Sequence, residues 1–214
     1  MTQTDTIFAL SSGQPPAGIA IIRISGPEAG RVLDVLAGGR PEPRQAVYRR
    51  FRDIGGVPLD DGLALWFPGP KSATGEDLAE LQVHGGRAVV AAVLNALGRM
   101  ESCRPAQAGE FTRRALENGR IDLTEAEGLA DLLAAETEAQ RQSALALAEG
   151  GLGRLVAAWE KQLLIESARV EALLDFADEG DVDDSGHDTG PLEQLVAALS
   201  ALRTAQPAER LRDG

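Results

Sequence analysis

The sequence has little of several residue types that commonly carry chemistry. Cys103 is the only cysteine among 214 residues, which excludes an intrachain disulfide framework, and no neighbouring residue marks its thiol as activated. We therefore expect Cys103 to be buried or inert, as free cysteines usually are. His84 and His187 are the only histidines, and no further ligand stands at metal spacing, so no metal site is predicted.

Catalytic motifs and long apolar runs are also missing. There is no G-x-x-x-x-G-K-[ST] P-loop, no G-x-S-x-G elbow and no self-contained nucleophile–base pair, so we predict no catalytic residue in this chain. The N-terminus has no basic region followed by an apolar run, which argues against a signal peptide. No stretch of about 18 apolar residues is present, so no membrane-spanning helix is expected.

Positive charge is scarce, and the excess of acid is local. The formal net charge is −12, and more than half of it lies between Asp175 and Asp188. No basic stripe marks a broad nucleic-acid-binding face. The acidic segment begins like a calcium loop, but Leu192 stands where the bidentate acid would be needed, so we expect a solvated linker. Lys71 and Lys161 are the only lysines, and arginine suits planar anions better than lysine does.

Residues 1–117 have the pattern of a mixed-sheet α/β domain. Short runs rich in Ile, Val and Leu predict strands, and apolar residues at helical spacing predict helices between them. Gly55-Gly56 separates two of these strands and indicates a hairpin. Strands are expected at 6–12, 19–25, 45–56, 57–67 and 78–86, and helices at 26–38 and 87–100.

Residues 118–214 are expected to form the first part of an α-helical bundle domain. The helix before this boundary ends at Asn118-Gly119, a natural C-terminal cap pair. Thr124, with Glu127 three residues later, predicts a capping box at the start of the next helix. Helices are expected over 109–119, 125–136, 137–176 and 192–206. The glycines of EGGLG, residues 149–153, indicate a kink in the third of these.

Two charged residues lie inside otherwise apolar strands. Arg23 is flanked by isoleucines, so its guanidinium must find an anion, either a carboxylate of the protein or a bound ligand. Glu80 lies among apolar residues, where a carboxylate is costly unless it is paired or hydrogen-bonded. It either pairs with a protein group or accepts two parallel donors from the edge of a pterin or guanine. The sequence leaves both alternatives open.

Four stretches occur in a characteristic order: DTIFALSSGQPPAGIAIIRISGP, KSATGEDLAELQVHGG, RPAQAGEFTRRALENGRIDLTEAEGLADLLAAET and ARVEALLDFADE. In this order and at this spacing they resemble the N-terminal part of the MnmE (TrmE) tRNA modification GTPase family. The block that begins at Gly109 is the most specific of the four. The resemblance covers most of residues 5–180.

The resemblance implies an N-terminal domain, residues 1–117, that is similar to folate-binding aminomethyltransferases and forms a homodimer. It also implies that this domain binds a tetrahydrofolate derivative, 5-formyl or 5,10-methylene, through Arg23, Glu80 and Arg120. The family commonly has lysine at the position of Arg120 and tyrosine at the position of Ala73. The charge is therefore kept at the first position, and an aromatic ring is lost at the second.

For the intact protein, the resemblance implies a GTPase whose G domain is inserted into the helical domain and uses potassium and magnesium. With the FAD-containing protein MnmG, in a heterotetramer, it would install a (carboxymethyl)aminomethyl group on the wobble uridine of certain tRNAs in the cytoplasm. This chain stops where the G domain would follow, so we expect it to have no GTPase activity by itself.

Two other functions remain open, a stand-alone folate-dependent aminomethyltransferase and a helical interaction module without a ligand. The cluster of arginines after Gly109 has a structural and a functional interpretation. Arg113 and Arg114 are expected to pair with Glu110 or Glu117 on the same helix. Contact with tRNA phosphate is the alternative.

Overall fold

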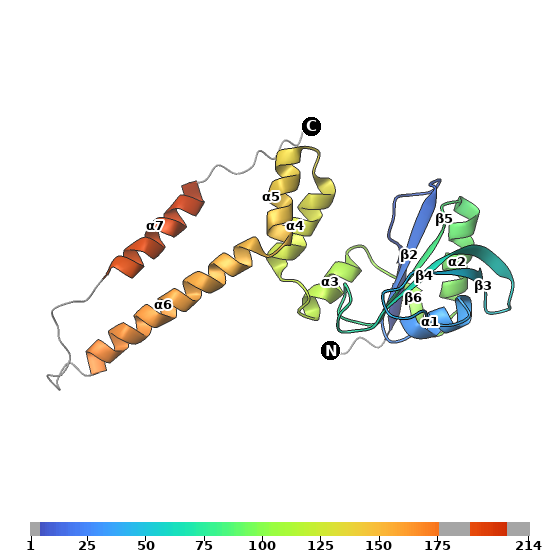
Figure 1. The fold of residues 1–214 in the computed structure, drawn as a ribbon, viewed down its shortest axis with the longest axis horizontal. Helices are drawn as coiled ribbons and strands as arrows, with labels where there is room; N and C mark the ends of the chain where they lie inside the picture. Colours follow the sequence, from blue (N-terminus) through green and yellow to red (C-terminus); the bar gives the residue numbers. More distant parts are fainter. Residues whose placement is uncertain (1–4, 176–188, 205–214) are drawn as a thin grey trace. The chain divides into compact units, whose positions relative to one another are not determined.

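The computed structural model describes residues 5–175 and 189–204, which fall into two compact units (Figure 1). The units meet between Ile121 and Asp122, a few residues beyond the boundary that the sequence suggested. The first unit contains a sheet and the second contains helices only. The acidic segment of residues 176–188, for which a linker was expected, lies outside the described residues.

A six-stranded mixed sheet forms the first unit, which confirms the predicted fold class. Its strand order is β3-β4-β5-β2-β1-β6, and every neighbouring pair is antiparallel except β1 with β6. The β3–β4 hairpin turns at Gly55-Gly56 as predicted, with Gly56 in the left-handed region at φ +82. The strands are β1 Thr6–Leu10, β2 Ile19–Ser25, β3 Val47–Arg52, β4 Pro58–Phe67, β5 Leu78–His84 and β6 Cys103–Pro105.

The hydrophobic core lies on one face of this sheet, beneath α1 (Ala29–Leu36) and α2 (Arg87–Gly98). Alternate residues of the central strands point into it, because successive side chains of a strand face opposite sides. Ile22, Ile24 and Leu81 are fully buried there. Arg23 and Glu80 therefore project from the opposite face, which none of these core residues covers.

The helix α3 (Glu110–Glu117) closes the first unit. It ends at Asn118-Gly119 as predicted, with Gly119 at φ +63. The amide of Gly119 donates to the carbonyl of Leu116, and the amide of Arg120 donates to the carbonyl of Ala115. These bonds satisfy the last carbonyls of the helix and turn the chain sharply at Arg120.

The second unit contains α4 (Leu123–Ala134), α5 (Glu138–Ala148), α6 (Gly151–Asp175) and α7 (Gly190–Thr204). The predicted capping box at Thr124 and Glu127 is wrong. Asp122 is the N-cap: its carboxylate accepts from the amide of Glu125 at 2.7 Å, and the carboxylate of Glu125 accepts from the amide of Asp122 at 2.7 Å. Asp is at least as good an N-cap residue as Thr, and Asp122 precedes Thr124 in the chain. Thr124 only donates its hydroxyl to the carboxylate of Asp122.

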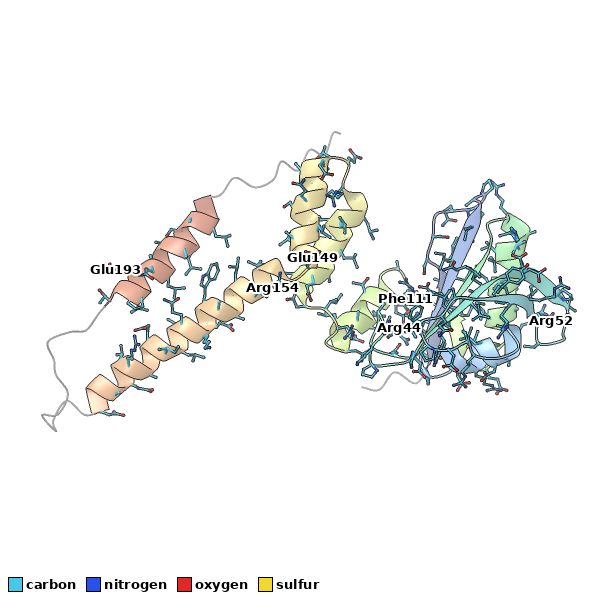
Figure 2. The ribbon with its side chains drawn as sticks, viewed as in Figure 1. Arg44, Arg52, Phe111, Glu149, Arg154 and Glu193 are labelled. Carbon is cyan, nitrogen blue, oxygen red and sulfur yellow. The ribbon has the colours of Figure 1, made fainter. Side chains whose placement is uncertain are left out.

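The helical pattern expected over residues 137–176 is divided into two helices, and the break after α5 falls at the glycines where a kink was expected. Gly150 adopts φ +72, a left-handed conformation that ends a helix. Arg154, on the first turns of α6, donates from its guanidinium to the carbonyl of Glu149 (Figure 2).

Among the helices in the described part of the chain, none has the length and hydropathy that a membrane crossing requires.

Candidate functional site

Strand pairing brings Arg23 and Glu80 into direct contact. The two residues are opposite each other on the antiparallel strands β2 and β5, so their side chains project from the same face. The Nε and Nη2 atoms of Arg23 both donate to Oε1 of Glu80, at 3.0 and 2.8 Å. The side chain of Glu80 is 13% exposed and that of Arg23 is 33% exposed. Glu80 is therefore the protein carboxylate that pairs with Arg23.

This ion pair still has hydrogen-bonding capacity for a ligand. Both donors of Arg23 converge on one oxygen, so Oε2 of Glu80 and Nη1 of Arg23 make no hydrogen bond within the described residues. The pair thus keeps one carboxylate acceptor and one guanidinium donor on a surface that remains partly exposed. Because each charge is balanced by its partner, a neutral polar ligand can bind here without leaving a charge unpaired.

An aromatic ring borders the pair. Phe111, on α3, places its ring centroid 6.0 Å from Cζ of Arg23, within the range of a cation–π contact (Figure 2). Its side chain is half-buried, so part of the ring remains accessible. No periodicity of the sequence marks Phe111, because its contact with Arg23 depends on how α3 packs against the sheet.

Arg120 is held by the loop that leads into β5. Its Nε donates to the carbonyl of Ser72 at 3.1 Å, and the side-chain amide of Asn118 donates to the carbonyl of Thr74 at 2.8 Å. Arg120 is exposed, and within the described residues no hydrogen bond or ion pair joins it to Arg23 or Glu80. The structure therefore brings two of the three predicted site residues together and anchors the third on the adjoining loop.

A cluster of ion pairs contacts this loop through Glu76. Arg114 is 1% exposed; its Nη1 donates to Glu76 at 3.1 Å, and its Nη2 donates to Asp5 at 2.9 Å and to Glu110 at 3.2 Å. Arg104 adds a bond to Glu110 at 2.6 Å. The cluster joins the start of β1, the loop before β5 and α3.

Pairing with arginine makes Glu110 strongly acidic. Hydrogen bonds from Arg104, the amide of Gln107 and Arg114 outweigh the effect of burial and lower the pKa of Glu110 to about 2. Burial raises the pKa of Asp5, but hydrogen bonds and charge from Arg104 and Arg114 overcome it and leave that pKa below its ordinary value. Both carboxylates are therefore ionised at neutral pH, as the arginines require.

The expected pairing of the corner arginines with Glu110 is confirmed. Arg114 contacts it at 3.2 Å with the expected spacing of four residues, and Arg113 lies 3.7 Å away with a side chain that is 51% exposed. The sequence did not indicate that Asp5 and Glu76 also bind Arg114, because these contacts join distant segments. Arg114 has a structural role.

Other residues that were considered for chemistry have ordinary environments. His84 is exposed at the end of β5, and its Nδ1 lies 2.9 Å from Asp60. Cys103 is half-buried, and burial raises the pKa of its thiol. Within the described residues, no group of three or more His, Cys, Asp and Glu side chains could hold a metal ion.

An open cleft of about 680 Å³ lies elsewhere, beside β1 and α2. It is lined by Phe8, Ala9, Leu10, Leu94, Asn95, Gly98, Arg99, Pro105 and Ala106. None of these residues is Arg23, Glu80 or Arg120. The polar pair is therefore not part of the lining of this mainly apolar cleft, although Ala9 pairs with Arg23 across β1 and β2.

Comparison with known families matches the two units separately. A family model described as "GTP-binding protein TrmE N-terminus" matches residues 6–120. A second model, described as "MnmE helical domain", matches residues 123–214. The two matches meet where the structure divides into its two units.

Curated proteins with the name tRNA modification GTPase MnmE match nearly the whole chain. The protein from Methylorubrum populi is 58% identical over 98% of this chain, and the protein from Rhizorhabdus wittichii is 59% identical over 99% of it. A relative from Rhodopseudomonas palustris is 51% identical over 100% of this chain. The matches cover 48%, 49% and 48% of these relatives, so the chain spans about half their length.

Proposed function

This chain belongs to the MnmE (TrmE) family of tRNA modification GTPases, and from that premise we propose that its first unit binds a tetrahydrofolate derivative. The observation that carries the proposal is the Arg23–Glu80 pair, with its unused acceptor and unused donor on an open sheet face. The ligand would be the 5-formyl or 5,10-methylene form, which supplies a one-carbon unit. No residue of this chain is assigned a catalytic step.

The chemistry of the pair suits the edge of a pterin. A pterin presents an amino group and a ring N–H that both donate, next to a carbonyl oxygen that accepts. Oε2 of Glu80 accepts from these donors, and Nη1 of Arg23 donates to the carbonyl or formyl oxygen. The ring of Phe111 offers a flat apolar surface for the heterocycle. Arg120 offers positive charge to the carboxylates of the glutamate tail.

The same sheet face supports the proposal that two copies of the chain associate. Ile19 and Tyr48 lie on this face and are 63% and 67% exposed. Exposed apolar and aromatic side chains on one face of a sheet are common at interfaces between proteins. The proposed assembly is a homodimer through the first unit.

At the level of the intact protein, the proposed function is that of the family. The longer protein would hydrolyse GTP with potassium and magnesium and act with MnmG on tRNA wobble uridines in the cytoplasm. This chain would contribute folate binding and dimerisation. The match of residues 123–214 to the MnmE helical domain favours this function over a stand-alone folate-dependent aminomethyltransferase.

The test is calorimetric titration of the chain with 5-formyltetrahydrofolate, with light scattering to measure the mass in solution. We expect saturable binding to a dimer. Glu80→Ala should abolish measurable binding, because the acceptor for the pterin donors is removed. Asp61→Ala is the matched control, since it breaks an exposed ion pair with Arg50 on the same sheet and should bind like the unsubstituted chain. Unchanged affinity in Glu80→Ala would refute the proposed site.

A further inference from the structure

We propose that the turn formed by residues 72–76 is the positioning element for Arg120, and that Gly75 is its key residue. The inference rests on the proposed function, because one of its readouts is affinity for a folate. It concerns a residue that acts through another, since Gly75 itself has no side chain to offer to a ligand.

The side chains of the corner after α3 pack directly on Gly75. A Cβ atom at this position would lie 2.8 Å from Cβ of Asn118 and 3.0 Å from Cγ of Arg120. The first of these atoms is fixed to the backbone, so it cannot move aside without shifting the corner. Gly75 also adopts φ +81, which side-chain-bearing residues rarely tolerate. Only glycine allows this approach.

The turn also supplies the hydrogen bonds that orient the corner. The carbonyl of Ser72 accepts from Nε of Arg120, and the carbonyl of Thr74 accepts from the side-chain amide of Asn118. With Nε held in this way, the terminal Nη1 and Nη2 of Arg120 make no hydrogen bond within the described residues. They form the end of the guanidinium that a carboxylate would meet.

The turn of residues 72–76 is also hydrogen-bonded to β2, the strand that carries Arg23. Ser25, two residues further along β2 and on the same face, has its hydroxyl 2.6 Å from that of Thr74 and donates to Glu76 at 2.8 Å. Arg114 holds the carboxylate of Glu76 from the other side. Ser25 and Thr74 are 0% and 1% exposed. A continuous buried connection therefore sets the position of Arg120 relative to Arg23.

Holding Nε in advance matters because an exposed arginine otherwise loses rotamer freedom when it binds a ligand. If the turn is displaced, the guanidinium must be ordered at the moment of binding. We expect the dissociation constant for 5-formyltetrahydrofolate to rise by about ten-fold in that case.

The chain offers a matched pair of glycines for the test. Gly56, in the β3–β4 hairpin, has φ +82, and a Cβ built there meets nothing within 4 Å. Gly75→Ala and Gly56→Ala therefore both place alanine at a positive φ of nearly the same size, and only Gly75→Ala is expected to displace Arg120. Both variants of the full chain are titrated with 5-formyltetrahydrofolate, alone and combined with Arg120→Ala.

A ligand-free readout accompanies the titration. The Nε–H of Arg120, assigned in an NMR spectrum by its loss in Arg120→Lys, should exchange slowly with water because it donates to Ser72. The inference expects this protection in the unsubstituted chain and in Gly56→Ala, and its loss in Gly75→Ala. If the unsubstituted chain keeps this protection but binds no folate, the proposed function fails while the positioning stands.

Three results would overturn the positioning itself. The first is an unprotected Nε–H in the unsubstituted chain. The second is equal affinity in Gly75→Ala and Gly56→Ala. The third is that Gly75→Ala lowers the affinity of the Arg120→Ala chain by the same factor as it lowers that of the unsubstituted chain. The turn would then act on the site without Arg120.

Discussion

At the scale of single residues, the two oxygens of Glu80 have different roles. Oε1 accepts both hydrogen bonds from Arg23, and Oε2 remains for a ligand. The same carboxylate therefore holds the arginine in place and keeps an acceptor, so the ion pair leaves room for the proposed ligand contact. The two interpretations that the sequence left open for Glu80 are compatible with each other.

The first prediction at this scale concerns Phe111. Phe111→Leu keeps apolar volume but removes the flat ring beside Arg23, so we expect the dissociation constant for 5-formyltetrahydrofolate to rise by about three- to ten-fold. Thermal unfolding should change little, because the ring is only half-buried. Calorimetry and a melting curve measure the two effects.

Phe111→Tyr is the conservative control, since it keeps the ring and its contact with Arg23. It should bind the folate like the unsubstituted chain. Equal affinity in the leucine and tyrosine variants would show that the ring does not contact the ligand.

At the scale of secondary-structure elements, the ionic cluster around Arg114 joins β1, α3 and the loop before β5. Its carboxylates are buried or half-buried, and each is paired with Arg104 or Arg114. Removing one partner would leave a buried charge unpaired, which is far more costly than losing an exposed ion pair. The stability of the first unit should therefore depend on pH.

The sign of this dependence follows from Glu110, whose pKa falls from its ordinary 4.5 to about 2. A lowered pKa means that the contribution to stability is complete above about 4.5 and is lost as the pH falls towards 2. We expect urea unfolding midpoints of the first unit, followed by the fluorescence of Trp66 in a Trp159→Phe background, to fall over this range. Glu110→Gln should flatten the dependence and lower the midpoint at neutral pH.

Glu138 provides the control for that prediction. Pairing with Arg141 also lowers its pKa to about 2, but the pair is fully solvated on the surface of α5. Glu138→Gln should leave the transition of Trp66 unchanged. A pH dependence that persists in Glu110→Gln would place its origin outside the cluster.

The contact between α4 and α5 gives a second prediction at this scale. A Cβ at Gly128 would lie 2.5 Å from the amide nitrogen of Ala148 and 2.7 Å from Cβ of Leu147. We expect Gly128→Ala to destabilise the helical unit by about 1–3 kcal/mol, because the helices must separate. Circular dichroism during urea unfolding measures the loss.

Gly98→Ala, at the end of α2, is the opposite case. Its Cβ would meet only Phe8, at 3.8 Å, which is an ordinary contact. Alanine there should be neutral or stabilising by up to about 1 kcal/mol. Equal changes of stability in Gly128→Ala and Gly98→Ala would show that the close approach at Gly128 does not decide the result.

At the scale of the whole molecule, the boundary between the units determines which fragment keeps the site. Arg120 and Asn118 belong to the first unit, where they bind the loop that contains Ser72 and Thr74. We predict that a fragment of residues 1–121 unfolds cooperatively and binds 5-formyltetrahydrofolate with the affinity of the full chain. Calorimetry and melting curves test both statements.

A fragment of residues 1–117 is the informative comparison, because it ends where the sequence suggested the boundary. It lacks Asn118 and Arg120, so it should bind the folate at least about ten-fold more weakly and melt at a lower temperature. Identical behaviour of the two fragments would contradict the placement of the corner in the first unit.

Much of the sheet could be predicted because strand patterns are local. β6 could not: it is three residues long, contains Pro105 and is fixed by pairing with β1, which no local pattern records. The contact of Arg23 with Glu80 spans 57 residues of sequence and depends on strand register. The cap at Asp122 could have been predicted from the sequence, since Asp122 and Glu125 have the same spacing as Thr124 and Glu127.

The alignment of Arg23 with Glu80 has a consequence for folding. They face each other in only one register of β2 against β5, and a slip of one strand by one residue would turn its charge toward the apolar interior. Misaligned chains are therefore penalised by the residues that form the proposed site. A ligand that spans the pair binds only aligned chains, and mass action then increases their share. A bound folate would thus increase the yield of chains that fold with the correct strand register.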